Sequence, residues 1–134
     1  MLDGCTVVAK IVGNRYFLAK NRVLVWENFE DAVVFDDDVF FVKGTNVANS
    51  EESGASFGLN RWGLSACNTT VLVTKDQPYD LLMERVLRET KTVEDAFAFI
   101  RNDLKKGSRY QWSNFILAYP GGVGVVEIGD GVAV

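Results

Sequence analysis

The helical pattern of this chain is confined to one stretch, between Pro78 and Gly107, with strand-like segments on both sides. The first half of this stretch places four apolar side chains on one helical face: Leu81, Leu82, Val86 and Leu87. A second apolar stripe follows Thr92, which together with Asp95 resembles a capping box at the start of a second helix, with Asp in the place more often held by Glu. Because only a few residues separate the two stripes, we expect an antiparallel helical hairpin.

The segments before and after this stretch are rich in β-branched and aromatic residues. Residues 5–12 and 15–20 flank Gly13–Asn14 and predict an N-terminal β-hairpin. A second hairpin is predicted around Gly121–Gly122. Further strands are expected over residues 23–27, 32–35, 39–44, 56–60 and 63–73, and an exposed polar loop over residues 46–56. The order of segments predicts an α+β layered fold with mainly antiparallel sheets, organised as a single domain over residues 1–134.

Composition excludes several classes of partner. The chain has 134 residues, a formal net charge of −4 and no block of Lys or Arg, so binding to nucleic acid or to an anionic membrane is not expected. Its apolar runs are far shorter than the roughly 20 residues that span a bilayer, and the N-terminus lacks the pattern of a signal peptide. We therefore expect a cytoplasmic protein. Two cysteines and no histidine favour neither a disulfide framework nor a metal site, and we expect no cofactor.

The lack of histidine also limits the ways in which a nucleophile can be activated. Without imidazole, the proton of a Ser or Cys nucleophile must pass to a carboxylate with a raised pKa, to a lysine with a lowered pKa, or to an α-amino group. Cys5, close to the start of the chain, raises the question whether it becomes an N-terminal nucleophile or only begins a strand. Cys67 is expected to be a small buried residue.

The order of segments resembles the N-terminal nucleophile (Ntn) hydrolases of the choloylglycine hydrolase and isopenicillin N acyltransferase type. The pieces that carry the resemblance extend over nearly the whole chain: "DGCT" at 3–6, "AKNR" at 19–22, "GLNRWGLSACN" at 58–68, the helical segment at 81–100 and "SNFILAYPGGVGVVEIG" at 113–129. The resemblance implies an αββα layered fold. It also implies a hydrolase or acyltransferase that cuts its own chain after Gly4 and acts on a small amide through the freed Cys5.

The resemblance also implies roles for individual residues. Asn68 corresponds to an asparagine that donates to the oxyanion, and Arg22 or Lys20 would contact the substrate or stabilise the thiolate. The family pattern after the second strand is Arg-Asn-x-Asp, whereas here Lys20 and Val23 stand in the places of the arginine and the aspartate. The loss of this aspartate leaves open whether the site is active.

The chain is about half as long as expected for this family, because the pattern ends after the second hairpin. We expect the uncovered sheet face to be covered in a homo-oligomer or by a complementary second half. Trp62 is a candidate for lining an acyl pocket. Two functions remain open: an amidohydrolase or acyltransferase of a non-peptide C–N bond, or a non-catalytic Ntn-like protein that serves in binding or assembly.

Overall fold

The computed structural model describes residues 5–22, 28–36, 38–46 and 51–134, and contains two β-sheets and two α-helices. The small sheet is an antiparallel hairpin of two strands, β1 (Thr6–Val12) and β2 (Arg15–Asn21). The large sheet has seven antiparallel strands: β3 (Phe29–Asp36), β4 (Val39–Asn46), β5 (Glu51–Asn60), β6 (Ser65–Leu72), β7 (Trp112–Tyr119), β8 (Gly122–Gly129) and β9 (Val132–Ala133). Sequence neighbours pair throughout, so the large sheet is a meander, interrupted between β6 and β7 by both helices.

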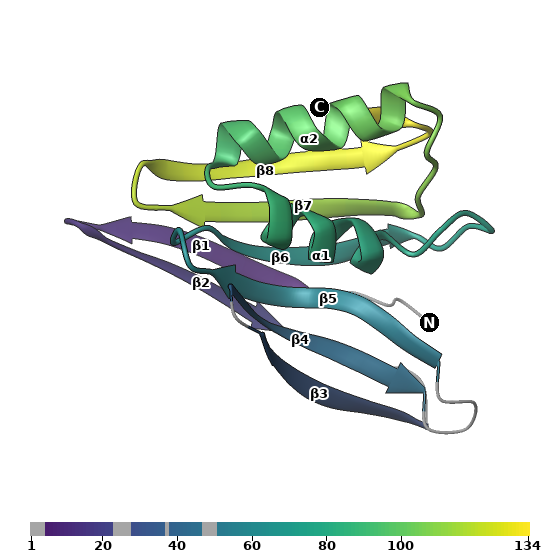
Figure 1. Cartoon of the computed structure of the whole chain (residues 1–134), viewed down its shortest axis with the longest axis horizontal. Coiled ribbons are helices and arrows are strands. Elements are labelled where there is room, and N and C mark those ends of the chain that lie inside the picture. Colours follow the sequence, from purple (N-terminus) through teal and green to yellow (C-terminus); the bar gives the residue numbers. More distant parts are fainter. Residues whose placement is uncertain (1–4, 23–27, 37, 47–50) are drawn as a thin grey trace.

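The helices lie on one face of the large sheet. α1 (Tyr79–Glu89) packs mainly on β5, and α2 (Val93–Lys105) packs on β7, β8 and β9 (Figure 1). Phe115, Leu117 and Ala66 point from the sheet into the same buried cluster as Leu82, Leu87 and Ile100 of the helices. The predicted N-cap is confirmed, because the Thr92 side chain accepts a hydrogen bond from the backbone N–H of Asp95. The main apolar core therefore lies between the helices and the sheet.

The β1–β2 hairpin lies on the opposite face of the large sheet, against β6, β7 and β8. Side chains alternate along a strand, so the neighbours of Phe115 and Ala66, among them Ile116 and Cys67, point toward the hairpin. Along β2 more exposed and less exposed side chains alternate, and the less exposed ones, Tyr16, Leu18 and Lys20, point toward the large sheet. The molecule thus has three layers over this region: helices, large sheet and hairpin.

The α+β class with mainly antiparallel strands agrees with the sequence-based expectation, but one segment differs. Residues 51–56, expected within an exposed loop, form the first half of β5, and Ala55 and Ser56 are buried. Small and polar residues are typical of loops in a sequence, but here α1 packs against them. Gly54 permits this packing, because a Cβ there would fall on the backbone carbonyl of Asp80 in the first turn of α1.

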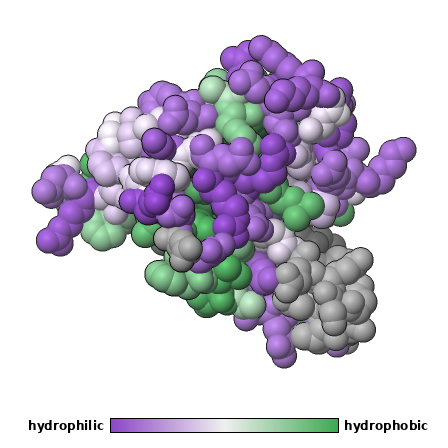
Figure 2. All heavy atoms as spheres, in the orientation of Figure 1, coloured by the Kyte–Doolittle hydropathy of each residue, from purple (hydrophilic) through white to green (hydrophobic). Residues whose placement is uncertain are grey.

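The expected strand at 23–27 lies outside the described residues. Beyond the hairpin, apolar side chains are exposed on the same face of the large sheet, over β3 to β5, and hydrophobic residues are visible around this region in Figure 2. No helix in the described part of the chain is long and apolar enough to cross a membrane.

Candidate functional site

The candidate site lies where β5 and β6 separate. These strands pair at only three positions, from Leu59–Ser65 to Phe57–Cys67, although both continue well beyond (Figure 1). The next residues, Ser56 on β5 and Asn68 on β6, are not paired with each other, and both are buried, with 2% of each exposed. In a buried gap between two strands, the backbone N–H and C=O groups lack the hydrogen bonds of regular strand pairing and need other hydrogen-bond partners.

Lys20 supplies these partners from the hairpin. Its ammonium group donates to the Ser56 hydroxyl at 2.7 Å, to the Asn68 Oδ1 at 2.9 Å and to the Ser56 carbonyl at 3.3 Å. Lys20 faces the large sheet from the hairpin side, whereas Asn68 points toward the helices, so the lysine side chain enters the gap between β5 and β6. Burial, the largest influence, lowers the pKa of Lys20, while the nearby Cys5 and Asp80 oppose this effect.

Asn68 is fully engaged as a donor. Its Nδ2 donates to the Ala55 carbonyl at 3.0 Å and to the Asp80 Oδ1 at 2.7 Å, which uses both amide hydrogens. Its Oδ1 accepts from Lys20. The sequence-based expectation is that the Asn68 side chain donates a hydrogen bond to the oxyanion. In this arrangement Asn68 can do so only if its bond to Ala55 or its bond to Asp80 opens.

Asp80 is the charged residue of this site that sequence reasoning missed. It lies in the first turn of α1, and its carboxylate reaches the gap from the helix side. Burial raises its pKa to about 6, against the opposing effects of the Asn68 hydrogen bond and of the positive charges of Lys20 and Arg22. An acidic residue just after Pro78 is ordinary at a helix start, so its sequence context gave no signal of a role in the site.

Cys5 lies at the edge of this cluster. It directly precedes β1, is partly buried, and shares the sheet-facing side of the hairpin with Val7 and Ala9. Burial lowers the pKa of both Lys20 and Arg22, and the negative charge of a Cys5 thiolate partly opposes this effect. Cys5 therefore interacts electrostatically with both cations. The structure therefore brings Cys5, Lys20 and Arg22 into one electrostatic environment.

Arg22 approaches the cluster from the residue after β2. Its guanidinium pairs with Asp31 on β3, and 14% of its side chain is exposed. It also acts electrostatically on Asp80 and on Tyr79. The Tyr79 hydroxyl hydrogen-bonds Thr70, and burial raises the pKa of Tyr79 to about 12, so the ring stays neutral around neutral pH.

Other residues singled out in the sequence lie elsewhere. Gly4 and Val23 are outside the described residues. Cys67 is buried on the hairpin side of β6, and burial raises the pKa of its thiol to about 12. Trp62 lies in the turn between β5 and β6, outside the gap at Ser56 and Asn68, and Arg61 and Lys91 lie over its ring.

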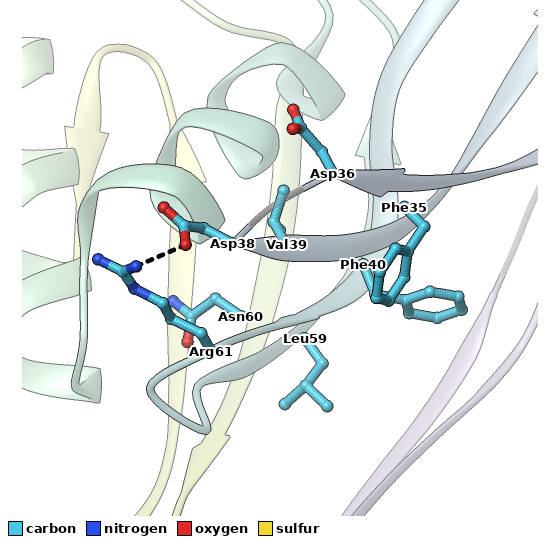
Figure 3. A pocket seen from close by; sticks show the side chains of 8 residues that line it. All are labelled: Phe35, Asp36, Asp38, Val39, Phe40, Leu59, Asn60 and Arg61. Atoms are coloured by element: carbon cyan, nitrogen blue, oxygen red, sulfur yellow. Dashed lines mark ion pairs between the residues drawn. The ribbon is translucent and has the colours of Figure 1, made fainter.

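A shallow hollow of about 210 Å³ lies at the β3–β4 end of the large sheet, apart from this cluster. Figure 3 shows that Phe35, Phe40 and Leu59 point to one side of the hollow, while Arg61 and Asp38 form an ion pair at 2.7 Å across its other side. Neither Cys5 nor any residue of the Lys20 network lines it.

Among the described residues, no three Cys, Asp or Glu side chains are grouped so as to hold a metal ion. Comparisons of the chain with protein-family models, with curated proteins and with solved structures found no match in any of the three.

Proposed function

We propose that this protein is an amidohydrolase or acyltransferase that attacks a small-molecule, non-peptide C–N amide bond with the Cys5 thiol. The observation that carries the proposal is the position of Cys5 on the same face of the hairpin as Lys20, whose ammonium group reaches into the gap between β5 and β6. Arg22, which is also partly buried, adds a second positive charge near Cys5. Positive charge near a cysteine favours the thiolate, which is the nucleophilic form. The resemblance of the sequence to Ntn hydrolases, which use their N-terminal residue as the nucleophile, also supports the proposal.

The reaction needs a proton acceptor as well as a nucleophile. After cleavage of the Gly4–Cys5 bond, the free α-amino group of Cys5 accepts the thiol proton, because its ordinary pKa is near 8. The thiolate adds to the substrate carbonyl, the proton passes to the leaving amine, and a thioester remains on Cys5. Water then hydrolyses the thioester, or an acceptor amine takes the acyl group.

Lys20 is the group in this proposal that stabilises negative charge on the carbonyl oxygen. Its weakest bond, to the Ser56 carbonyl at 3.3 Å, is the one that an oxyanion most easily replaces. Asn68 then acts on the oxyanion through Lys20, because its own amide hydrogens are held by Ala55 and Asp80. Arg22 contributes a second positive charge close to the thiolate.

The proposal is tested by the intact mass of freshly purified protein and by labelling with a thiol-reactive amide or lactone probe. We expect loss of Met1 to Gly4 from the mass, and labelling that Cys5→Ala abolishes and Cys67→Ala preserves. The second candidate function, binding or assembly without catalysis, is supported instead if Met1 to Gly4 are retained and Cys5 resists the probe in the folded protein.

A further inference from the structure

Asp80 differs from an ordinary acidic residue at a helix start. Asp95 also lies in the first turn of a helix, α2, but it is exposed, and it is the backbone N–H of Asp95 that bonds Thr92. The Asp80 side chain instead turns inward and accepts from the buried Asn68 at 2.7 Å. Its position is set by the close approach of α1 to Gly54 on β5.

The bond from Asn68 to Asp80 determines which way round the Asn68 amide lies. With Nδ2 toward Asp80 and Ala55, the amide oxygen faces the Lys20 ammonium at 2.9 Å. A rotation of the amide by half a turn would set its oxygen against the Asp80 carboxylate and its N–H groups against the ammonium. Both contacts would then be repulsive, so a carboxylate at position 80 and an ammonium at position 20 select one orientation.

We infer that Asp80 is a positioning residue of the candidate site: it fixes the Asn68 amide so that its oxygen holds the Lys20 ammonium beside Cys5. The inference rests on the proposed role of Cys5. Asp80 acts through two hydrogen bonds, from Asn68 to its carboxylate and from Lys20 to Asn68. Lys20 is the cross-strand partner of Val7, so Cys5, two residues before Val7 on the same face of the hairpin, is its diagonal neighbour and lies within reach of its charge. It needs no contact of its own with the substrate.

The test measures the rate at which iodoacetamide alkylates Cys5, in a Cys67→Ala background in which Cys5 is the only thiol. We expect Asp80→Ala to slow alkylation about tenfold at neutral pH, because Asn68 loses an acceptor and Lys20 its fixed position. Asp80→Asn should retain a rate near that of the parent, since its amide oxygen accepts the same bond and the Lys20 ammonium still selects the orientation of the Asn68 amide. Asp95→Ala is the matched control, since it also removes a first-turn aspartate, and it should have no effect.

A double-mutant cycle tests the route through Asn68. We expect Asp80→Ala to have no further effect on the alkylation rate in an Asn68→Ala background, because the contact through which Asp80 acts is already gone. Circular dichroism verifies folding for each variant. If Asp80→Ala does not fold, Asp80→Ser replaces it, because a serine side chain is too short to hold the same bond.

The outcomes separate the inference from the proposed function. The inference is overturned if Cys5 is alkylated as fast in Asp80→Ala as in Asp95→Ala. It is also overturned if alkylation is as slow in Asp80→Asn as in Asp80→Ala, because the effect would then come from the charge alone. A parent protein whose Cys5 reacts no faster when folded than in denaturant overturns the proposed function itself.

Discussion

Asp80 carries a cost in stability that its place in the site explains. Burial raises the pKa of its carboxyl from 3.8 to about 6, so the folded protein binds this proton more tightly than the unfolded chain does. Stability therefore falls as the pH rises from about 4 to about 6, and it stays lower at higher pH. The rise in pKa corresponds to about 3 kcal/mol between the fully protonated and fully ionised limits.

Asp80→Asn should remove this pH dependence, because the amide does not ionise and still accepts the bond from Asn68. Urea unfolding at about pH 4 and about pH 8 gives the free energy of unfolding of both proteins. We expect the value for Asp80→Asn minus the value for the wild type to be about 2 kcal/mol larger at pH 8 than at pH 4. Asp95→Asn, at the exposed position in α2, serves as the control. An equal difference between wild type and Asp80→Asn at the two pH values would contradict a raised pKa at Asp80.

At the scale of elements, the site depends on how α1 meets β5. Gly54→Ala would place a methyl group on the Asp80 carbonyl and push the first turn of α1 away from the strand. The Gly54 backbone does not need a positive φ, so alanine is otherwise acceptable there, and the expected loss of about 1 to 3 kcal/mol comes from the clash.

Urea unfolding and Cys5 alkylation together test the effect of Gly54→Ala, and both stability and alkylation rate should fall. Gly122→Ala is the matched control, because a Cβ there has no neighbour closer than 3.9 Å, an ordinary contact. A Gly54→Ala protein as stable and as reactive as this control would show that the approach of α1 to β5 does not set the site.

The sequence predicted elements that local chemistry determines, and missed those that depend on packing. The Thr92 cap and both hairpins were recognisable because their turn and cap residues act within a few positions in the chain. The first half of β5 was missed, because small polar residues become strand only when a helix covers them. Lys20 and Asn68 were candidates from a resemblance, whereas Asp80 reaches them only through the tertiary placement of α1.

At the scale of the whole molecule, one sheet face is only partly covered. The hairpin covers β6 to β8, while four side chains on the same face over β3 to β5 remain exposed: Val33 at 66%, Phe35 at 85%, Phe40 at 36% and Leu59 at 43%. Phe35 is the cross-strand partner of Phe40, and Phe40 that of Leu59, so these side chains form one apolar surface. The hairpin layer does not extend over this surface, so the described part of the chain leaves it uncovered.

The homo-oligomer expected from the sequence stays a prediction, and this apolar surface is where we expect a second copy to bind. Phe35→Lys should lower the average mass in solution, as measured by light scattering over a range of concentrations, because it replaces the most exposed apolar side chain of the surface with a charge. Phe17→Lys, at a side chain 54% exposed on β2, is the matched control and should leave the mass unchanged. A wild-type protein that is monomeric at every concentration contradicts the prediction, and a mass lowered only by Phe17→Lys moves the interface to the hairpin.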